Sequence, residues 1–201
     1  MMFKESQIRV LELFRKNIFL NESIRKISLI LGRSYPKIYE AIKELERQKM
    51  ILITKVGNSH VCSLILNKET IAMLSLLDKQ ESFSKKIPNI DKILDFKEFL
   101  DEVIIVSGSY AKGKQTNKSD IDLILITREE AHKKQGLMEN MTMTFLPEVH
   151  VIAFSYKTFV EMLLNDEFNL GKETFKARLI FRNPERYHEL IKEAIKNGFK
   201  G

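Results

Sequence analysis

The sequence predicts an α/β (α+β) protein in two parts: three helices with a β-hairpin, followed by a small mixed sheet flanked by helices. Two observations carry this prediction. Apolar residues follow helical spacing through most of the first fifty positions, and β-branched runs take over at residue 51. Further along, Val103–Val106 and Ile121–Ile126 are strongly apolar runs of strand length, each next to turn-forming or polar residues.

The length of 201 residues is enough for two domains of modest size. No apolar run approaches the roughly 20 residues that a membrane-spanning helix needs, and no apolar stretch near the start is typical of a secretion signal. Cys62 is the one cysteine in the sequence, which excludes a disulfide scaffold and a cysteine-based zinc site. We therefore expect a cytoplasmic protein without a membrane partner.

The basic charge is concentrated at the start of the chain. Residues 1–66 contain 12 Lys and Arg against 6 Asp and Glu, whereas residues 67–201 contain 21 of each kind. The whole net charge of +6 therefore lies in the first third. An excess of this kind is typical of a surface that meets phosphates, although a solvated basic surface has the same composition.

The first third is predicted to hold three helices. Apolar residues at helical spacing predict the first helix over residues 7–18. Asn21 is a candidate N-cap for the second helix, which we expect to end at Gly32, since glycine accepts the left-handed conformation found just past a helix end. Ser34 is then placed to cap a third helix, with Pro36 in its first turn, where proline costs no hydrogen bond.

A β-hairpin is predicted to follow the third helix. Ile51–Val56 and Val61–Leu66 are aliphatic and β-branched runs, and the Gly57–Ser59 segment between them is a hairpin turn signal. The order helix, helix, short glycine-containing turn, helix, hairpin is that of a winged helix-turn-helix. The stretch Ile24–Ile51 resembles the winged-helix families of prokaryotic transcription regulators.

That resemblance implies binding to double-stranded DNA, with the early residues of the third helix in the major groove. It points to seven residues in the third helix and the wing: Ser34, Tyr35, Lys37, Tyr39, Lys55, Asn58 and His60. Such modules also serve for dimerisation or protein docking, in which case the two tyrosines pack against a neighbouring surface. A homodimer is a further expectation.

The middle of the chain is predicted to connect two domains. Residues 69–77 and 90–100 are predicted helices, and residues 80–86 between them are polar and without periodicity. Pro88 would block the continuation of a helix from upstream. These features predict a winged-helix domain over residues 1–66, a connector helix and linker over 67–84, and a second domain over 85–201.

Two aspartates begin the second apolar strand of the later domain. Because residues i and i+2 of a strand face the same way, Asp120 and Asp122 are expected to project together, about 7 Å apart along the backbone. Ionised carboxylates at that spacing repel each other, so a divalent cation between them would explain the pair. Ligands that are all oxygen suit Mg²⁺, and Mn²⁺ is the alternative ion.

Gly108 and Ser109 follow the first apolar strand and supply the other half of the pattern. A glycine at a strand end permits a sharp turn and a close approach of the backbone, and a serine hydroxyl together with turn N–H groups can hold phosphate oxygens. An in-line displacement on a nucleotide requires carboxylates that bind a cation and hydrogen-bond donors that hold the phosphate oxygens.

The stretch GSYAKGKQTNKSDIDL, Gly108–Leu123, resembles the Gly-Ser, ten residues, Asp-x-Asp signature of the DNA polymerase beta nucleotidyltransferase superfamily. The resemblance covers roughly residues 90–195, is closest to the minimal prokaryotic members, and includes Ser119 as a nucleotide-binding position. It implies a nucleoside triphosphate substrate and Mg²⁺. Minimal members are often antitoxins that modify a tyrosine on a partner toxin of the HEPN class, and others modify small molecules or RNA ends.

The family's usual third acid lies on a later strand, which here corresponds to residues 148–154. His150 occupies the expected position, and Glu148 lies one strand repeat earlier on the same face. Either residue could help hold the metal or accept the proton of the acceptor hydroxyl. The alternative is that this position is lost and the chain is a DNA-binding regulator that senses a nucleotide without turning it over.

Other polar residues are weaker candidates. Lysines flank the signature and could contact a triphosphate, as could basic residues near position 175, although solvated surface charge is the simpler interpretation. His132 and His188 have no partner at metal-ligand spacing, and we assign them no role. These weaker basic candidates are Lys112, Lys114, Lys118, Lys172, Lys176 and Arg178.

Overall fold

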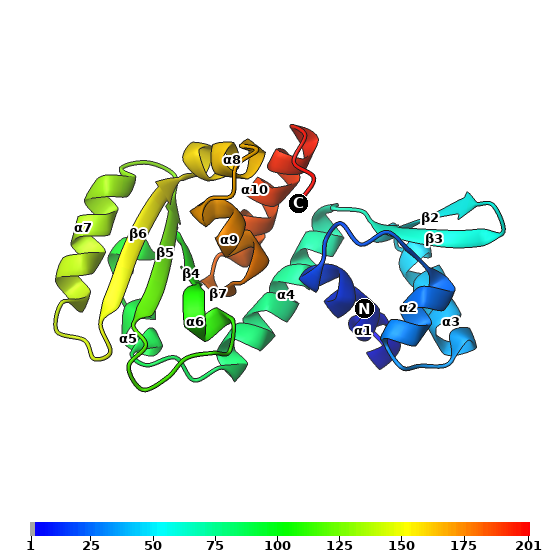
Figure 1. Cartoon of the computed structure of the whole chain (residues 1–201), viewed down its shortest axis with the longest axis horizontal. Helices are drawn as coiled ribbons and strands as arrows, with labels where there is room; N and C mark the ends of the chain where they lie inside the picture. The colour runs from blue at the N-terminus through cyan, green and yellow to red at the C-terminus, as the bar shows by residue number, and fades with distance from the viewer. Residues whose placement is uncertain (1–2) are drawn as a thin grey trace. The chain divides into compact units, whose positions relative to one another are not determined.

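The computed structural model describes residues 3–201, so the first two residues of the predicted N-terminal domain lie outside it. The chain divides into two compact units, the first ending at Leu77 and the second spanning Asp78–Gly201 (Figure 1). Among the described residues, no helix combines the length and the apolar character that crossing a bilayer requires.

The described residues of the first unit form three complete helices, the first part of a fourth, and a three-stranded sheet in the order β1-β3-β2, in which both strand pairs are antiparallel. Helix, helix, helix and hairpin follow one another as the sequence predicts, and this confirms the winged-helix arrangement. The elements are α1 (Glu5–Lys16), β1 (Glu22–Ser23), α2 (Ile24–Ile30), α3 (Tyr35–Arg47), β2 (Ile51–Val56) and β3 (Ser59–Leu64).

The three helices bury one apolar face each. Phe14 of α1, Ile27 of α2 and Ile42 of α3 are fully buried in a common cluster. The start of α2 differs from the prediction: Ser23 is the N-cap, and its Oγ accepts the N–H of Lys26 at 3.2 Å. The reason is that the chain before α2 pairs with β3 as the short strand β1, which moves the helix start past Asn21.

The boundary between the units falls inside the helix α4 (Lys68–Ser84). The predicted division at residues 66 and 84 therefore differs from the observed one, and the predicted polar linker is helical up to Ser84. Tertiary contacts hold this segment within the second unit. His188 and Asp78 share a hydrogen bond of 2.6 Å and are both buried, and the ring of Phe83 packs edge-on against Phe181.

The second unit contains a four-stranded sheet and helices on both of its faces.

The helix predicted over residues 90–100 differs in the structure. It is broken, because Phe96 is extended and separates a short α-helix from a 3-10 turn. The elements after α4 are α5 (Ile90–Leu94), η1 (Lys97–Phe99), β4 (Val103–Val106), α6 (Gly108–Ala111), β5 (Ile121–Thr127), α7 (Ala131–Thr142), β6 (Val149–Ser155), α8 (Tyr156–Leu164), α9 (Leu170–Lys176), β7 (Leu179–Arg182) and α10 (Pro184–Lys196).

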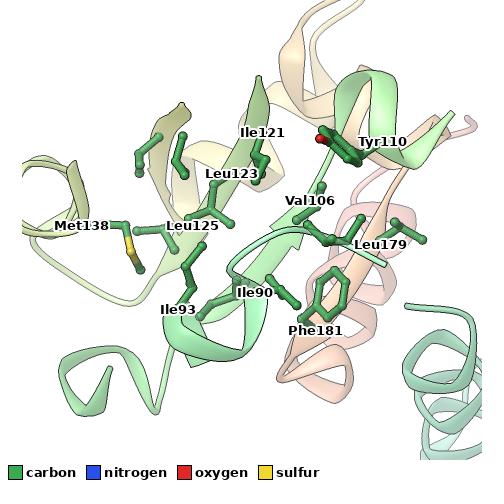
Figure 2. Packing of buried hydrophobic residues seen from close by; sticks show 14 of the residues in the cluster. Ile90, Ile93, Val106, Tyr110, Ile121, Leu123, Leu125, Met138, Leu179 and Phe181 are labelled. Carbon is green, nitrogen blue, oxygen red and sulfur yellow. The ribbon is translucent and has the colours of Figure 1, made fainter. Parts of the chain in front are cut away.

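The sheet has the order β6-β5-β4-β7 and is mixed: β5 runs parallel to β6, while β4 is antiparallel to β5 and β7. One face packs on α5 and α7, and Figure 2 shows the β5 side chains Ile121, Leu123 and Leu125 within this cluster, with Met138 of α7 and Ile93 of α5. The other face is covered by α8 and α10, which lie on the opposite side of the sheet from α7 (Figure 1).

The buried pair His188 and Asp78 should be important for the stability of the second unit. Replacing His188 with Ala removes its hydrogen bond to the buried Asp78, and breaking a buried pair of this kind typically costs about 3–5 kcal/mol. We expect urea denaturation, followed by circular dichroism, to show a loss of this size. Glu185 on the same helix makes only an exposed ion pair with Lys79, at 3.5 Å, so Glu185→Ala should cost at most about 1 kcal/mol. Equal losses for the two variants would contradict the expectation.

Candidate functional site

The candidate site lies where β5 and β6 begin side by side. The parallel register pairs Ile121 with Val149 and Asp122 with His150, and the N–H of Ile121 donates to the C=O of Glu148 at 2.9 Å. Ile121 and Val149 are buried in the core, while Asp122 and His150 lie on the opposite face. The strand alternation expected from the sequence is therefore observed, and it exposes the polar residues at the strand starts.

Asp122 packs against the turn that follows β4. Gly108 opens the short helix α6 with a φ of +61°, and a Cβ built on it would overlap Oδ2 of Asp122 and lie 2.8 Å from its Cγ. The N–H of Ser107 also donates to the C=O of Asp122 at 2.9 Å. The glycine that the sequence singled out for close backbone approach thus makes room for a carboxylate of the same site.

Asp120 lies with the residues of β6 instead. The Nε2 atom of His150 is 3.7 Å from Oδ2 of Asp120 and 3.7 Å from Oε1 of Glu148. One ligand atom from each of the three side chains lies within 4.8 Å of the others, and all three residues are exposed. The sequence predicted all four polar residues on one face and gave His150 and Glu148 as residues that could help hold the metal, but it did not predict that both lie next to Asp120.

The donors at the strand starts fit a divalent cation. The carboxylates of Asp120 and Asp122 are at least partly exposed, and a third carboxylate, from Glu148, lies nearby. Mg²⁺ typically binds one or two carboxylates and keeps several waters, which this open arrangement allows. Asp120 and Asp122 would hold such an ion, and it would neutralise charge on phosphate oxygens.

The serines of the signature differ in what they contact. Ser109 is partly exposed on α6, and its C=O accepts the N–H of Lys114 at 2.9 Å. The Oγ of Ser119 accepts the N–H of Thr116 at 2.8 Å, which shapes the loop between α6 and β5. The Oγ of the buried Ser107 donates to the C=O of Ala177 at 3.3 Å and ties the turn to the segment before β7.

Several weaker candidates have structural contacts. Lys112 forms a 2.7 Å ion pair with Glu173 of α9, so its charge is compensated within the unit. The guanidinium of Arg178 lies 4.9 Å from the centre of the Tyr187 ring, and the amine of Lys176 lies 5.2 Å from that of Phe168. Lys114, Lys118, Lys172 and His132 have exposed or partly exposed side chains, while His188 belongs to the buried pair with Asp78.

An open depression of about 670 Å³ adjoins the cluster along β6. Glu148 and His150 line one part of it, and the rest is lined by the polar residues Glu139 and Thr142 of α7 and by apolar residues of the following loop and of β6. Met143 and Leu146 on this apolar side are 78% and 86% exposed. The groups that could act on an acceptor therefore lie beside a surface that could hold an apolar part of it.

In the first unit, all seven residues predicted to contact DNA are exposed. Tyr35 of α3 lines one depression together with Asn58 and His60 of the hairpin, so the third helix and the wing converge there. Lys37 and Tyr39 line a second depression. Five of the seven predicted residues thus line two depressions on the surface of the winged helix, while Ser34 and Lys55 line neither.

Arg25 and Arg33 also line the depression shared by α3 and the hairpin. Arg25 lies on α2, and Arg33 lies in the turn before α3, where Nη2 is 3.2 Å from Oε1 of Glu5. Sequence reasoning missed both residues because it considered only the third helix and the wing. Their basic character, close to the helix-turn-helix, was the signal that could have found them.

Comparisons with known proteins identify the second unit. A family model described as a nucleotidyltransferase domain matches residues 87–197. No curated protein matches the chain at a significant level. Two solved structures are similar to parts of it. One is MepR, a transcription regulator of the Staphylococcus aureus multidrug efflux pump MepA, at 17% identity and a TM-score of 0.35 over 46% of this chain and 72% of that one.

The other solved structure is ZitR of Lactococcus lactis, a zinc-responsive MarR family member, at 19% identity and a TM-score of 0.31. This match covers 50% of the chain and 73% of ZitR. At these TM-scores neither similarity supports an argument about the chain, and the winged-helix assignment depends on the observed order and pairing of the elements.

The contact between Gly108 and Asp122 generates a prediction with a matched control. Gly108→Ala should displace the Asp122 carboxylate and reduce affinity for a non-hydrolysable nucleoside triphosphate in the presence of Mg²⁺, measured by calorimetry. Gly113 has a similar φ of +64°, but a Cβ there meets nothing within 4 Å. Both variants carry the left-handed strain of about 1–2 kcal/mol, and only Gly108→Ala should impair binding. An equal loss of affinity in Gly113→Ala would contradict this account.

Proposed function

Because the chain belongs to the nucleotidyltransferase domain family, we propose that it is a Mg²⁺-dependent enzyme that transfers a nucleoside monophosphate from a nucleoside triphosphate to a hydroxyl group. One observation carries the proposal. Two carboxylates begin β5, and one of them, Asp122, packs directly against Gly108 of the turn that carries Ser109. The carboxylates that could bind a cation and the turn that could hold phosphate oxygens therefore lie together at one edge of the sheet.

The reaction forms a bond between the acceptor oxygen and the α-phosphorus and breaks the bond from that phosphorus to the bridging oxygen, so pyrophosphate leaves. Asp120 and Asp122 would hold the cation, and Ser109 with the adjacent turn would orient the phosphates. The proton of the acceptor hydroxyl would pass to His150, on β6, or to Glu148, directly before it. A positioned base of this kind typically contributes about 10²–10⁴-fold in rate.

For the acceptor, we propose a hydroxyl on a partner protein encoded beside the gene, with a toxin of the HEPN class as the first candidate. The family resemblance motivates this choice, and the depression along β6 supports it. Small polar acceptors and nucleic-acid ends would gain little from the exposed apolar side chains of Met143 and Leu146. A protein surface could cover them while it presents a side-chain hydroxyl to the cluster.

A second function has one observation in its favour. The position in register with Asp122 on β6 is His150, where the family usually has an acid. A chain that binds a nucleotide there without transferring it would be a nucleotide sensor coupled to a DNA-binding unit. Nucleotide binding without any transfer to partner proteins, small molecules or RNA would favour this function over the enzyme.

We further propose that the first unit binds double-stranded DNA and that the protein regulates transcription, including that of its own operon. The basic excess of residues 1–66 supports this, as does the exposure of the α3 and hairpin residues around Arg25 and Arg33. We propose a homodimer for this activity, since helix-turn-helix proteins commonly bind two half-sites as dimers.

The transferase proposal is tested by incubating the protein with Mg²⁺ and each α-labelled nucleoside triphosphate, with and without proteins encoded beside its gene. We expect label on one partner in the native chain and no label with Asp122→Asn. Asp166 is an exposed acid between α8 and α9 and does not belong to the cluster of Asp120, Glu148 and His150, so Asp166→Asn should retain activity. Label transfer by Asp122→Asn at the native rate would contradict the assignment.

The DNA-binding proposal predicts a steep dependence of affinity on salt. Each phosphate contact adds about 0.9 to the slope of log affinity against log salt concentration. Arg25→Ala or Lys37→Ala should weaken binding and lower that slope by up to about 1. Arg9 is ion-paired with Glu5 and Glu12 on α1, so Arg9→Ala serves as a control that should change little. A fluorescence titration at several salt concentrations measures the effect, and equal slopes in all variants would be the contrary result.

A further inference from the structure

The cluster at the start of β6 has the composition of a metal site that contains a nitrogen ligand, unlike the oxygen-only position next to Asp122. Asp120, Glu148 and His150 bring two carboxylates and one imidazole together, with Nε2 of His150 at 3.7 Å from an oxygen of each acid. Distances of this size between ligand atoms are compatible with one ion of ordinary bond length, about 2.0–2.2 Å from each ligand. The side chains are 49%, 76% and 53% exposed, so solvent or substrate can fill the remaining positions.

The backbone holds these ligands at fixed spacing. His150 is the residue paired with Asp122 in the parallel register, and the bond from the N–H of Ile121 to the C=O of Glu148 fixes the residues immediately before β5 and β6 beside each other. The buried neighbours Ile121 and Val149 anchor both strand starts in the core. His150 therefore lies within the sheet, and Asp120 and Glu148 directly precede two paired strands, which favours ion binding over a loose surface cluster.

The imidazole decides which ion fits. Mg²⁺ prefers oxygen ligands, whereas imidazole nitrogen suits Zn²⁺ and other first-row transition ions, which generally bind nitrogen-containing sites more tightly. We propose that Asp120, Glu148 and His150 form a site for a divalent transition ion, such as Mn²⁺, Co²⁺ or Zn²⁺, in preference to Mg²⁺. This site shares Asp120 with the oxygen-only position next to Asp122 but uses β6 for its other ligands.

The use of the bound ion rests on the proposed transferase function, while ion binding itself rests on the three residues. The site adjoins the depression along β6, so it lies on the side from which an acceptor would approach. With Nε2 of His150 as a ligand, one carboxylate oxygen of Glu148 stays available to take the proton of the acceptor hydroxyl. Asp122, next to Gly108, would hold the cation that binds the triphosphate.

The test uses the full chain without nucleotide and follows Mn²⁺ by electron paramagnetic resonance. We expect bound Mn²⁺ with nitrogen modulation in the spin echo, displacement by equimolar Zn²⁺ or Co²⁺, and little displacement by a large excess of Mg²⁺. His150→Ala should remove the nitrogen signal and weaken Mn²⁺ binding roughly tenfold or more, since loss of even an outer partner of a ligand costs about 10–100-fold. Glu148→Gln should weaken binding and keep the nitrogen signal.

Matched variants separate the possible outcomes. His132 lies exposed on α7, away from the cluster, so His132→Ala should behave as the native chain. His150→Asp should still bind an ion but lose the nitrogen signal and shift its preference towards Mg²⁺. A native chain without nitrogen modulation, or one in which Mg²⁺ displaces Mn²⁺ as readily as Zn²⁺ does, would overturn the inference.

Failure of the proposed transferase function would look different. Asp122→Asn should lose Mg²⁺-dependent nucleotide binding and keep the nitrogen-coupled Mn²⁺ signal. If the native chain binds no nucleotide with Mg²⁺ yet shows the His150-dependent signal, the metal site stands and the transferase proposal fails. If the native chain binds a nucleotide with Mg²⁺ but shows no nitrogen-coupled Mn²⁺ signal, the transferase proposal stands and the metal site fails.

Discussion

The parallel register of β5 on β6 is the constraint on which the candidate site depends. The hydrogen bond from the N–H of Ile121 to the C=O of Glu148 begins this pairing, and it sets residue 150 beside residue 122. Side chains alternate along each strand, so a slip of one residue would send the polar side chains of one strand into the core. The apolar residues Ile121, Val149 and Val151 prevent such a slip, because each fully buried side chain of this kind contributes about 1.5–3 kcal/mol.

The antiparallel strand β4 adds the second part of the arrangement. Its end lies next to the start of β5, since Val106 pairs with Leu123, and the chain therefore turns at Ser107 and Gly108 directly over Asp122. A parallel neighbour would bring its own start to this edge and carry the turn to the opposite end of the sheet. The mixed topology thus explains how a phosphate-type turn and two strand-start carboxylates come to occupy one edge.

Local sequence patterns predicted the strands of this sheet. The contacts of His150 and the helicity of residues 80–84 depend on residues far apart in the chain, and the sequence did not predict them. The apolar runs at residues 103–106 and 121–126 and their alternation were readable because strand periodicity is a property of neighbouring residues. Which acid meets His150 was not readable, since it depends on the pairing of strands about 28 residues apart in the chain. The helicity of residues 80–84 was missed for the same reason, because contacts with His188 and Phe181 hold a segment whose own sequence is polar.

The two parts of the chain differ in net charge, and this difference bears on the anionic ligands that we propose for each of them. Residues 1–66 have a fixed excess of Lys and Arg, which can neutralise DNA phosphates without any added ion. Residues 67–201 are balanced, and the described residues at the strand starts present three carboxylates, with the nearby Lys112 already paired to Glu173. A triphosphate would be repelled from such a surface unless divalent cations were bound first. If the second unit binds a nucleotide as we propose, ion occupancy is therefore a precondition for that binding, whereas the proposed DNA-binding surface needs no added ion. The ions that bind at His150 would then decide when the second unit can act.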